Sequence, residues 1–159
     1  MGVNYNPKIV TDGLVLCLDA ANKRSYPGAG TTWTDLKGSN HGTLTNSPTF
    51  SSDNGGGIVL DGTDDYVDCG NPNIDIADGY TVSILFKAVS LNTYSQLVTR
   101  DHSGRSRFWQ FRISSGNSLN FIRFNASESV TANFSGNSSL SNGNTSVSYT
   151  HLRAHETSL

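Results

Sequence analysis

Apolar and polar side chains alternate in residues 80–88, and this pattern constrains the fold more than any other stretch. Every second position, beginning with Tyr80, is apolar, and the positions between them are polar except for Leu85. A period of two is that of a β-strand with one packed face, whereas an amphipathic helix has a period of 3.6. The stretch therefore predicts a long strand with one buried and one wetter face.

Shorter segments along the chain also suggest strands. Residues 13–19 form a continuous apolar run of the length of a buried strand, and Gly and Pro follow them. We expect further strands at residues 32–36, 42–45, 58–60, 66–69, 96–100, 108–114, 119–125 and 130–134. The turn-forming residues 115–117 predict that the segments around them form a hairpin within a meander. No useful helical periodicity occurs before residue 146, so the sequence predicts an all-β fold and disfavours parallel α/β architecture.

The length of 159 residues suits one domain. We expect residues 1–11 to be a lead-in and residues 12–145 to be the domain. Residues 146–157 resemble the translation of a sequencing-library adapter, so residues 146–159 are predicted to be a non-native tail. His151 and His155 stand four apart in that tail, beside Glu156, but two histidines without a third placed ligand do not predict a metal site.

Charge and hydropathy exclude several classes of protein. A net charge of −2 and a pI near 6.0 argue against general nucleic-acid binding, which needs a basic surface. No apolar run approaches the roughly 20 residues needed to cross a bilayer, and no signal peptide follows Met1, so we expect synthesis in the cytoplasm and no membrane insertion. Cys17 and Cys69 each lie in an apolar run and are predicted to be free thiols.

Several segments together resemble the concanavalin A-like lectin/glucanase superfamily, most closely the laminin-G-like domains of phage and environmental viral structural proteins. The similarity lies in residues 13–22, 25–28 with 32–33, 42–45 and 60–67, and it extends over about residues 12–125. It implies a concanavalin A-like antiparallel β-sandwich of jelly-roll type. The Trp-His strand that this family has next is missing from the chain, which implies a domain truncated at its C-terminus, with the departure beginning near Ala126.

Four aspartates lie within eight residues around the Asp61-Gly62 turn, the others being Asp64, Asp65 and Asp68. Carboxylate oxygens are ligands that Ca²⁺ prefers, and the family resemblance includes members with calcium at loop positions. Asp64 and Asp65 are therefore the candidate calcium ligands. The alternative is a solvated turn, since Asp and Gly are ordinary turn formers.

Sugar binding requires an aromatic platform beside hydrogen-bonding groups. In residues 108–113 alternation aligns Trp109 with two apolar side chains, which predicts a core position for Trp109, and it places Gln110 and Arg112 together on a more exposed face. Tyr94, Gln110 and Arg112 are the candidate ligand-binding residues. Trp33 is expected to pack beneath loops.

Catalysis is not expected. A glycoside hydrolase of this fold needs two placed carboxylic acids, but the chain has only two glutamates, Glu128 and Glu156, and the second lies in the predicted tail. Outside the tail the histidines are His41 and His102, both in loop-like sequence that contains no nucleophile elbow and no phosphate-binding Gly loop.

These observations predict a non-catalytic carbohydrate-binding module of a phage-type tail, fibre or capsid-associated protein, located in the virion. The expected partners are a cell-surface glycan and other virion subunits. One alternative is a structural or decoration domain without a ligand. A second alternative is a fragment of a glycoside hydrolase of the same fold.

Overall fold

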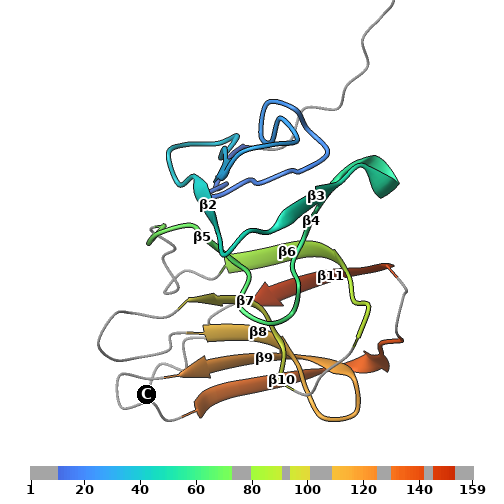
Figure 1. Ribbon diagram of the computed structural model, residues 1–159. Helices are drawn as coiled ribbons and strands as arrows, with labels where there is room; N and C mark the ends of the chain where they lie inside the picture. Colours follow the sequence, from blue (N-terminus) through green and yellow to red (C-terminus); the bar gives the residue numbers. More distant parts are fainter. Residues whose placement is uncertain are drawn as a thin grey trace, which may run out of the picture. The chain divides into compact units, whose positions relative to one another are not determined.

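The computed structural model describes residues 11–72, 80–90, 94–100, 109–124, 130–141 and 145–152. The chain divides into two compact units, Met1–Ile74 and Asp75–Leu159. Every strand pairing in the described residues is antiparallel, and these residues contain no α-helix (Figure 1). None of them forms a helix long and apolar enough to span a membrane. The predicted all-β class is confirmed at this level.

Short strands make up the first unit. They are β1 (Thr32–Trp33), β2 (Gly42–Thr45), β3 (Thr49–Ser51), β4 (Gly57–Val59) and β5 (Tyr66–Asp68), with a single 3₁₀ turn, η1 (Asp53–Gly55), between β3 and β4. They form a three-stranded sheet of order β1-β2-β5 and a two-stranded sheet, β3-β4. The predicted strands on both sides of Asp61-Gly62 are present, but they pair with different partners, so the turn connects two sheets instead of closing a hairpin.

The prediction of a buried strand over residues 13–19 is wrong. This segment is irregular, because side chains and loops take up its backbone groups in place of a neighbouring strand. The N–H of Cys17 donates to the Asp35 carboxylate and the Cys17 carbonyl accepts from Leu36, while the N–H of Asp19 donates to Ser25 Oγ. An apolar run predicts burial, and its residues are indeed mostly half-buried, but the run does not determine which group its backbone pairs with.

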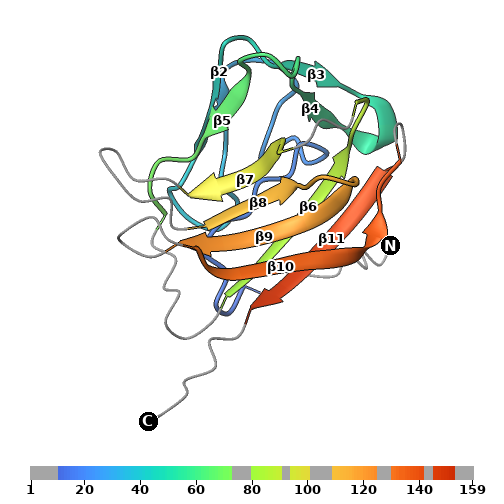
Figure 2. The same cartoon turned by 90° about the horizontal axis from the view of Figure 1, so that it is seen from below.

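Longer strands make up the second unit. They are β6 (Tyr80–Lys87), β7 (Gln96–Arg100), β8 (Trp109–Ile113), β9 (Ser118–Phe124), β10 (Val130–Ser139) and β11 (Thr145–Leu152). Four of them form a meander sheet of order β10-β9-β8-β7, and β11 pairs with β6 (Figures 1 and 2). The predicted meander is confirmed, and β10 extends beyond the predicted residues 130–134.

The β6 strand bears out the alternation that predicted it. Its odd-numbered side chains are exposed and its even-numbered ones are half-buried, with Leu85 67% exposed. The Tyr80 ring contacts Trp109 and Phe121, at centroid distances of 5.8 and 6.1 Å. Its less exposed face therefore packs toward one face of the meander sheet, and Figure 2 shows β6 and β11 crossing that sheet on one side.

The hairpin between β8 and β9 closes at residues 114–118, as its sequence predicts. Gly116 and Asn117 have positive φ angles of 85° and 58°, a conformation that glycine and asparagine adopt at least cost. The N–H of Asn117 donates to the Ser114 carbonyl, and the N–H of Ser114 donates to the Ser118 carbonyl. This closure fixes the register of β8 against β9, and with it the side chains that lie across from one another on each face.

The residues that resemble an adapter translation take part in strand pairing. From Thr145 to Leu152, β11 pairs with the whole of β6. Backbone hydrogen bonds of this kind are available to any extended segment that meets an unpaired strand edge. The pairing therefore does not test where the segment comes from, and its foreign origin stays a prediction; residues 153–159, with His155 and Glu156, lie outside the described residues.

Candidate functional site

The meander sheet has two chemically different faces. One carries Trp109, Phe111, Ile113 and Phe121, all 2 or 3% exposed. Trp109 and Phe121 stack at 6.0 Å, and both contact Tyr80 of β6. The predicted core position of Trp109 is confirmed, and this apolar face is part of the packing of the unit.

The opposite face is mostly polar, although it also carries Ile122, and its central residues Gln110, Asn120 and Ile122 are only 1–3% exposed. Alternation along β8 and the pairing of Arg112 with Asn120 place these two side chains together on it, and the pairing of Asn120 with Ser135 continues the row onto β10. Arg112 Nε donates to Asn120 Oδ1 at 3.3 Å, and Asn120 Nδ2 donates to Asn133 Oδ1 and to Ser135 Oγ. We call Tyr94, Arg112, Asn120, Asn133 and Ser135 the polar sheet face.

Tyr94 joins this face from the lead-in to β7. Its N–H donates to the Ile113 carbonyl at 2.8 Å, and the Ile113 N–H donates back to Ser95. Its φ angle is 69°, a left-handed conformation that is rare for a bulky residue and costs on the order of 1–3 kcal/mol. The Arg112 guanidinium carbon lies 4.6 Å from the centre of the Tyr94 ring, and the tyrosine is 58% exposed. The strained backbone thus holds an exposed aromatic ring against a cation.

The predicted exposure of Gln110 is wrong. Sequence alternation placed it with Arg112 on a more exposed face, but its side chain is 1% exposed. Its neighbours on the same face are buried as well, since Ile122 and Asn120 are each 3% exposed, so this part of the face is covered. Within the described part of the chain, Gln110 Nε2 has no hydrogen-bond partner, which is costly for a buried amide.

The structure thus brings together two of the three predicted ligand residues, Tyr94 and Arg112. Sequence analysis did not identify Asn120, Asn133 and Ser135 as part of the same face. The available signal was the hairpin register, which places Asn120 directly across from Arg112. The sequence does not show that β9 pairs with β10, so the position of the β10 residues on this face could not be predicted.

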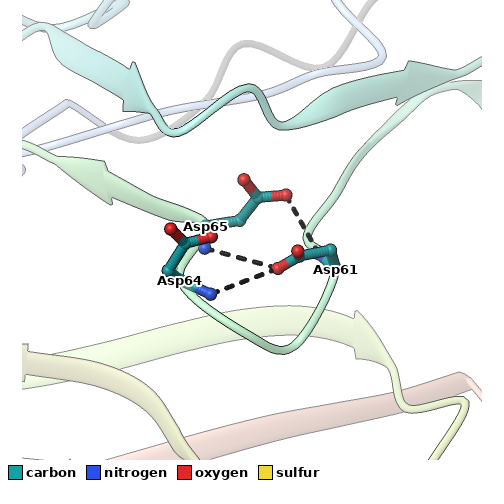
Figure 3. Close-up of side chains that lie close together, drawn as sticks. All are labelled: Asp61, Asp64 and Asp65. Atoms are coloured by element: carbon teal, nitrogen blue, oxygen red, sulfur yellow. Dashed lines mark hydrogen bonds between the residues drawn. The ribbon is translucent and has the colours of Figure 1, made fainter.

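The acidic turn forms a second cluster, in the first unit (Figure 3). Asp61, Asp64 and Asp65 have carboxylate oxygens within 4.8 Å of one another. Asp61 Oδ1 accepts from the N–H groups of Thr63, Asp64 and Asp65 at 2.8–3.4 Å, and Asp65 Oδ2 accepts from the N–H of Asp61 at 3.0 Å. The Thr63 N–H is the largest cause of the lowered pKa of Asp61, and the Asp64 and Asp65 donors add to it.

These carboxylates suit Ca²⁺ only in part. Such an ion takes six to eight oxygens, and here Asp61 Oδ1 and Asp65 Oδ2 already accept backbone hydrogen bonds within the turn. The predicted ligand Asp64 is exposed, and its carboxylate has no hydrogen bond to the described residues. A calcium ion would therefore be held chiefly by Asp64 and by the remaining oxygens of Asp65 and Asp61.

Asp35 organises the other loops of the first unit. Its carboxylate accepts from the N–H groups of Cys17, Lys37, Gly38 and Asn40 at 2.9–3.3 Å, and its own N–H donates to His41 Nδ1. Burial alone would raise the pKa of Asp35, which is 4% exposed, but the four N–H donors outweigh burial and lower it. A carboxylate held this way is a structural group, and the backbone N–H of the same residue occupies Nδ1 of His41, one of the two histidines predicted to be non-catalytic.

Thiol chemistry is not supported either. Cys17 and Cys69 are free and half-buried, as predicted for unbridged thiols. Burial, and then the nearby carboxylates, raise the pKa of both thiols. A raised pKa keeps a thiol protonated at neutral pH and makes it a poor nucleophile. Glu128 and His102 lie outside the described residues.

No protein-family model matches this chain, and no curated protein or solved structure matches it.

Proposed function

We propose that this protein is a non-catalytic carbohydrate-binding module and that its second unit binds glycan on the polar sheet face. The observation that carries the proposal is the Tyr94–Arg112 pair, an exposed aromatic ring held at 4.6 Å from a guanidinium beside a row of amide and hydroxyl groups. A pyranose presents an apolar face and a rim of hydroxyls, so it needs both kinds of contact at once.

Two further proposals concern the fold and the setting. The antiparallel sheets are compatible with a concanavalin A-like sandwich of jelly-roll type, and the sequence resemblance favours the laminin-G-like branch of that superfamily. On that resemblance, the protein is part of a phage-type tail, fibre or capsid-associated assembly, with a cell-surface glycan and other virion subunits as partners. Calcium at Asp64 and Asp65 is a separate proposal about the first unit, since no carboxylate belongs to the polar sheet face.

Binding to an array of cell-surface glycans tests the function. The informative variant is Tyr94→Gly, because glycine adopts a φ of 69° without strain while the ring is deleted. We expect the glycan signal to fall by about tenfold or more, since aromatic contacts of this size are worth about 1–3 kcal/mol. The matched control is Tyr66→Ala, which removes another half-exposed tyrosine from the first unit.

Three results would contradict the proposal. Equal loss in Tyr94→Gly and Tyr66→Ala would locate binding elsewhere or indicate a general loss of structure. Absence of glycan binding by the folded wild-type chain would favour the ligand-free structural or decoration domain. Release of reducing sugar from a bound glycan would favour the hydrolase alternative.

A further inference from the structure

Charge is distributed unevenly over the meander sheet. Its four strands contain three arginines, Arg100, Arg112 and Arg123, and not one acidic residue. The register places Arg100 and Arg123 opposite Trp109, on the apolar side of the sheet. Arg112 is therefore the single formal charge that the described strands place on the polar sheet face, and the groups around it are neutral amides, hydroxyls and one phenol.

The environment of Arg112 leaves a defined part of its guanidinium available. Nε donates to Asn120 Oδ1, and the Tyr94 ring covers the group at 4.6 Å. Neither neighbour carries a negative charge, and no carboxylate of the described residues forms an ion pair with Arg112. The two terminal nitrogens have no hydrogen-bond partner among these residues. They form the end of the guanidinium that can bind a carboxylate with two parallel hydrogen bonds.

The site is held in place before any ligand arrives. Asn120 is 3% exposed and is itself fixed by Asn133 and Ser135, so the bond from Arg112 ends on an ordered acceptor. Arg112 is half-buried, which makes a missing counter-charge more costly than at an open surface. An arginine that is positioned but not neutralised fits an anion supplied by the ligand.

Resting on the proposed function, we infer that the polar sheet face recognises an acidic glycan, in which a uronic-type carboxylate binds the terminal nitrogens of Arg112. The exposed Tyr94 ring contacts the apolar face of the sugar, and the exposed Asn133 and Ser135 side chains are the partners for its hydroxyls. A planar carboxylate matches the fork of the guanidinium. Nucleic-acid phosphate is not the favoured anion, because the whole chain has a net charge of −2.

Calorimetric titration of the full chain with three small ligands tests this inference. The probes are trigalacturonic acid, its methyl ester and neutral galactotriose. We expect the free acid to bind about 10- to 100-fold more tightly than the ester or the neutral sugar, which is the effect of one charge-assisted hydrogen-bonding contact. Increasing salt is expected to weaken the binding of the free acid and to leave the binding of the ester and the neutral sugar unchanged.

Variants assign the effect to Arg112. Arg112→Gln is expected to reduce affinity for the acid to that of the ester while leaving the ester unchanged. Arg112→Lys keeps the charge but loses the fork, and we expect an intermediate affinity. Arg24→Gln, which removes an exposed arginine from the first unit, is the charge-matched control and is expected to bind like wild type. Near-UV circular dichroism checks that each variant is folded; if Arg112→Gln is not, Arg112→Lys carries the test.

The outcomes separate this inference from the proposed function. If acid, ester and neutral sugar bind equally, the acidic specificity is overturned and glycan binding stands. The same holds if Arg112→Gln and Arg112→Lys leave the preference for the acid intact. A 6-sulfated galactose trisaccharide that binds as tightly as the acid would overturn recognition of a carboxylate in particular. If the folded wild-type chain binds no oligosaccharide, both the inference and the proposed function are overturned.

Discussion

The hydrogen bonds of two carboxylates in the first unit are largely complete, whereas those of the Arg112 guanidinium in the second unit are not. Asp35 and Asp61 each accept three or more backbone N–H groups from their own loops. Arg112 shares one nitrogen with Asn120, and its terminal nitrogens have no partner in the described chain. The cluster of aspartates is the more conspicuous feature of the sequence, but its charges are largely used in shaping loops.

This difference indicates where a ligand is to be sought. A polar group whose hydrogen bonds are complete stabilises the fold, and a ligand that recruits it must first break those bonds. A polar group that is positioned but incomplete has capacity left for a ligand. By this criterion the polar sheet face is the better site, although it has no sequence motif.

The largest effect is expected where the backbone of the first unit is tightest. A Cβ on Gly56 would lie 2.8 Å from the Ala20 carbonyl oxygen, and its φ angle is 129°. Gly56→Ala is therefore expected to lower the free energy of unfolding by about 2–5 kcal/mol, from backbone strain and overpacking together. Urea denaturation followed by circular dichroism measures it.

The neighbouring glycine is the control for that variant. A Cβ on Gly57 would meet no atom within 4 Å. Gly57→Ala is expected to change the midpoint of denaturation little. Equal destabilisation by the two variants would contradict the close approach of Gly56 to residue 20.

Replacing one of the two carboxylate oxygens of Asp35 is expected to have the next largest effect on stability. In Asp35→Asn, an NH₂ group replaces one oxygen and faces N–H groups, so we expect a loss of about 1–3 kcal/mol in the free energy of unfolding. Asp53→Asn, at an exposed position, is the control. The folded pKa of Asp35 is lowered, so its contribution is present above the ordinary value of about 3.9 and is lost as the pH falls below it. The difference between wild type and Asp35→Asn should therefore shrink near pH 3, and a constant difference would contradict this role.

Sequence periodicity predicted the second unit better than the first. The alternation in β6 and the hairpin residues between β8 and β9 depend on neighbours close in the chain, so local pattern was sufficient. In residues 13–19 the backbone partners are Asp35, Ser25 and Leu36, and a side chain that replaces a neighbouring strand leaves no periodic signal.

The candidate site could be predicted only in part, for a related reason. Sequence chemistry selected Tyr94 and Arg112, and the structure places them in contact. The predicted exposure of Gln110 was wrong because alternation distinguishes the two faces of a strand but does not tell which face is covered, and Ile122 and Asn120 on the same face are also buried. The contribution of Asn133 and Ser135 depends on the pairing of β9 with β10, which no local pattern specifies.

Tyr80 provides a smaller test on the apolar side of the second unit. Its hydroxyl is buried without a partner in the described residues, and burial raises its pKa to about 12, although the Arg123 and Arg100 charges oppose this. Tyr80→Phe removes the unpartnered hydroxyl and is expected to stabilise the chain by about 1 kcal/mol at pH 7.

The same residue gives a pH dependence of known sign. Because the folded pKa lies above the ordinary value of about 10, the unfolded chain loses this proton first, and stability falls between about pH 10 and 12. Tyr80→Phe should lose less stability over that range. Tyrosinate absorbance at 295 nm during alkaline titration checks the assignment, and ionisation of Tyr80 near pH 10 in the folded protein would contradict it.

The smallest effect is expected from calcium. The polar sheet face includes no carboxylate, and in the acidic turn Asp61 and Asp65 already accept backbone hydrogen bonds. Addition of EDTA, or of Ca²⁺ at about 1 mM, is therefore expected to change glycan affinity by less than about twofold, since the ion would need several further oxygens. Loss of glycan binding in EDTA, reproduced by Asp64→Asn with Asp65→Asn, would reverse the comparison. It would mean that the turn holds its carboxylates ready for an ion, and that hydrogen bonds within a loop do not exclude a ligand there.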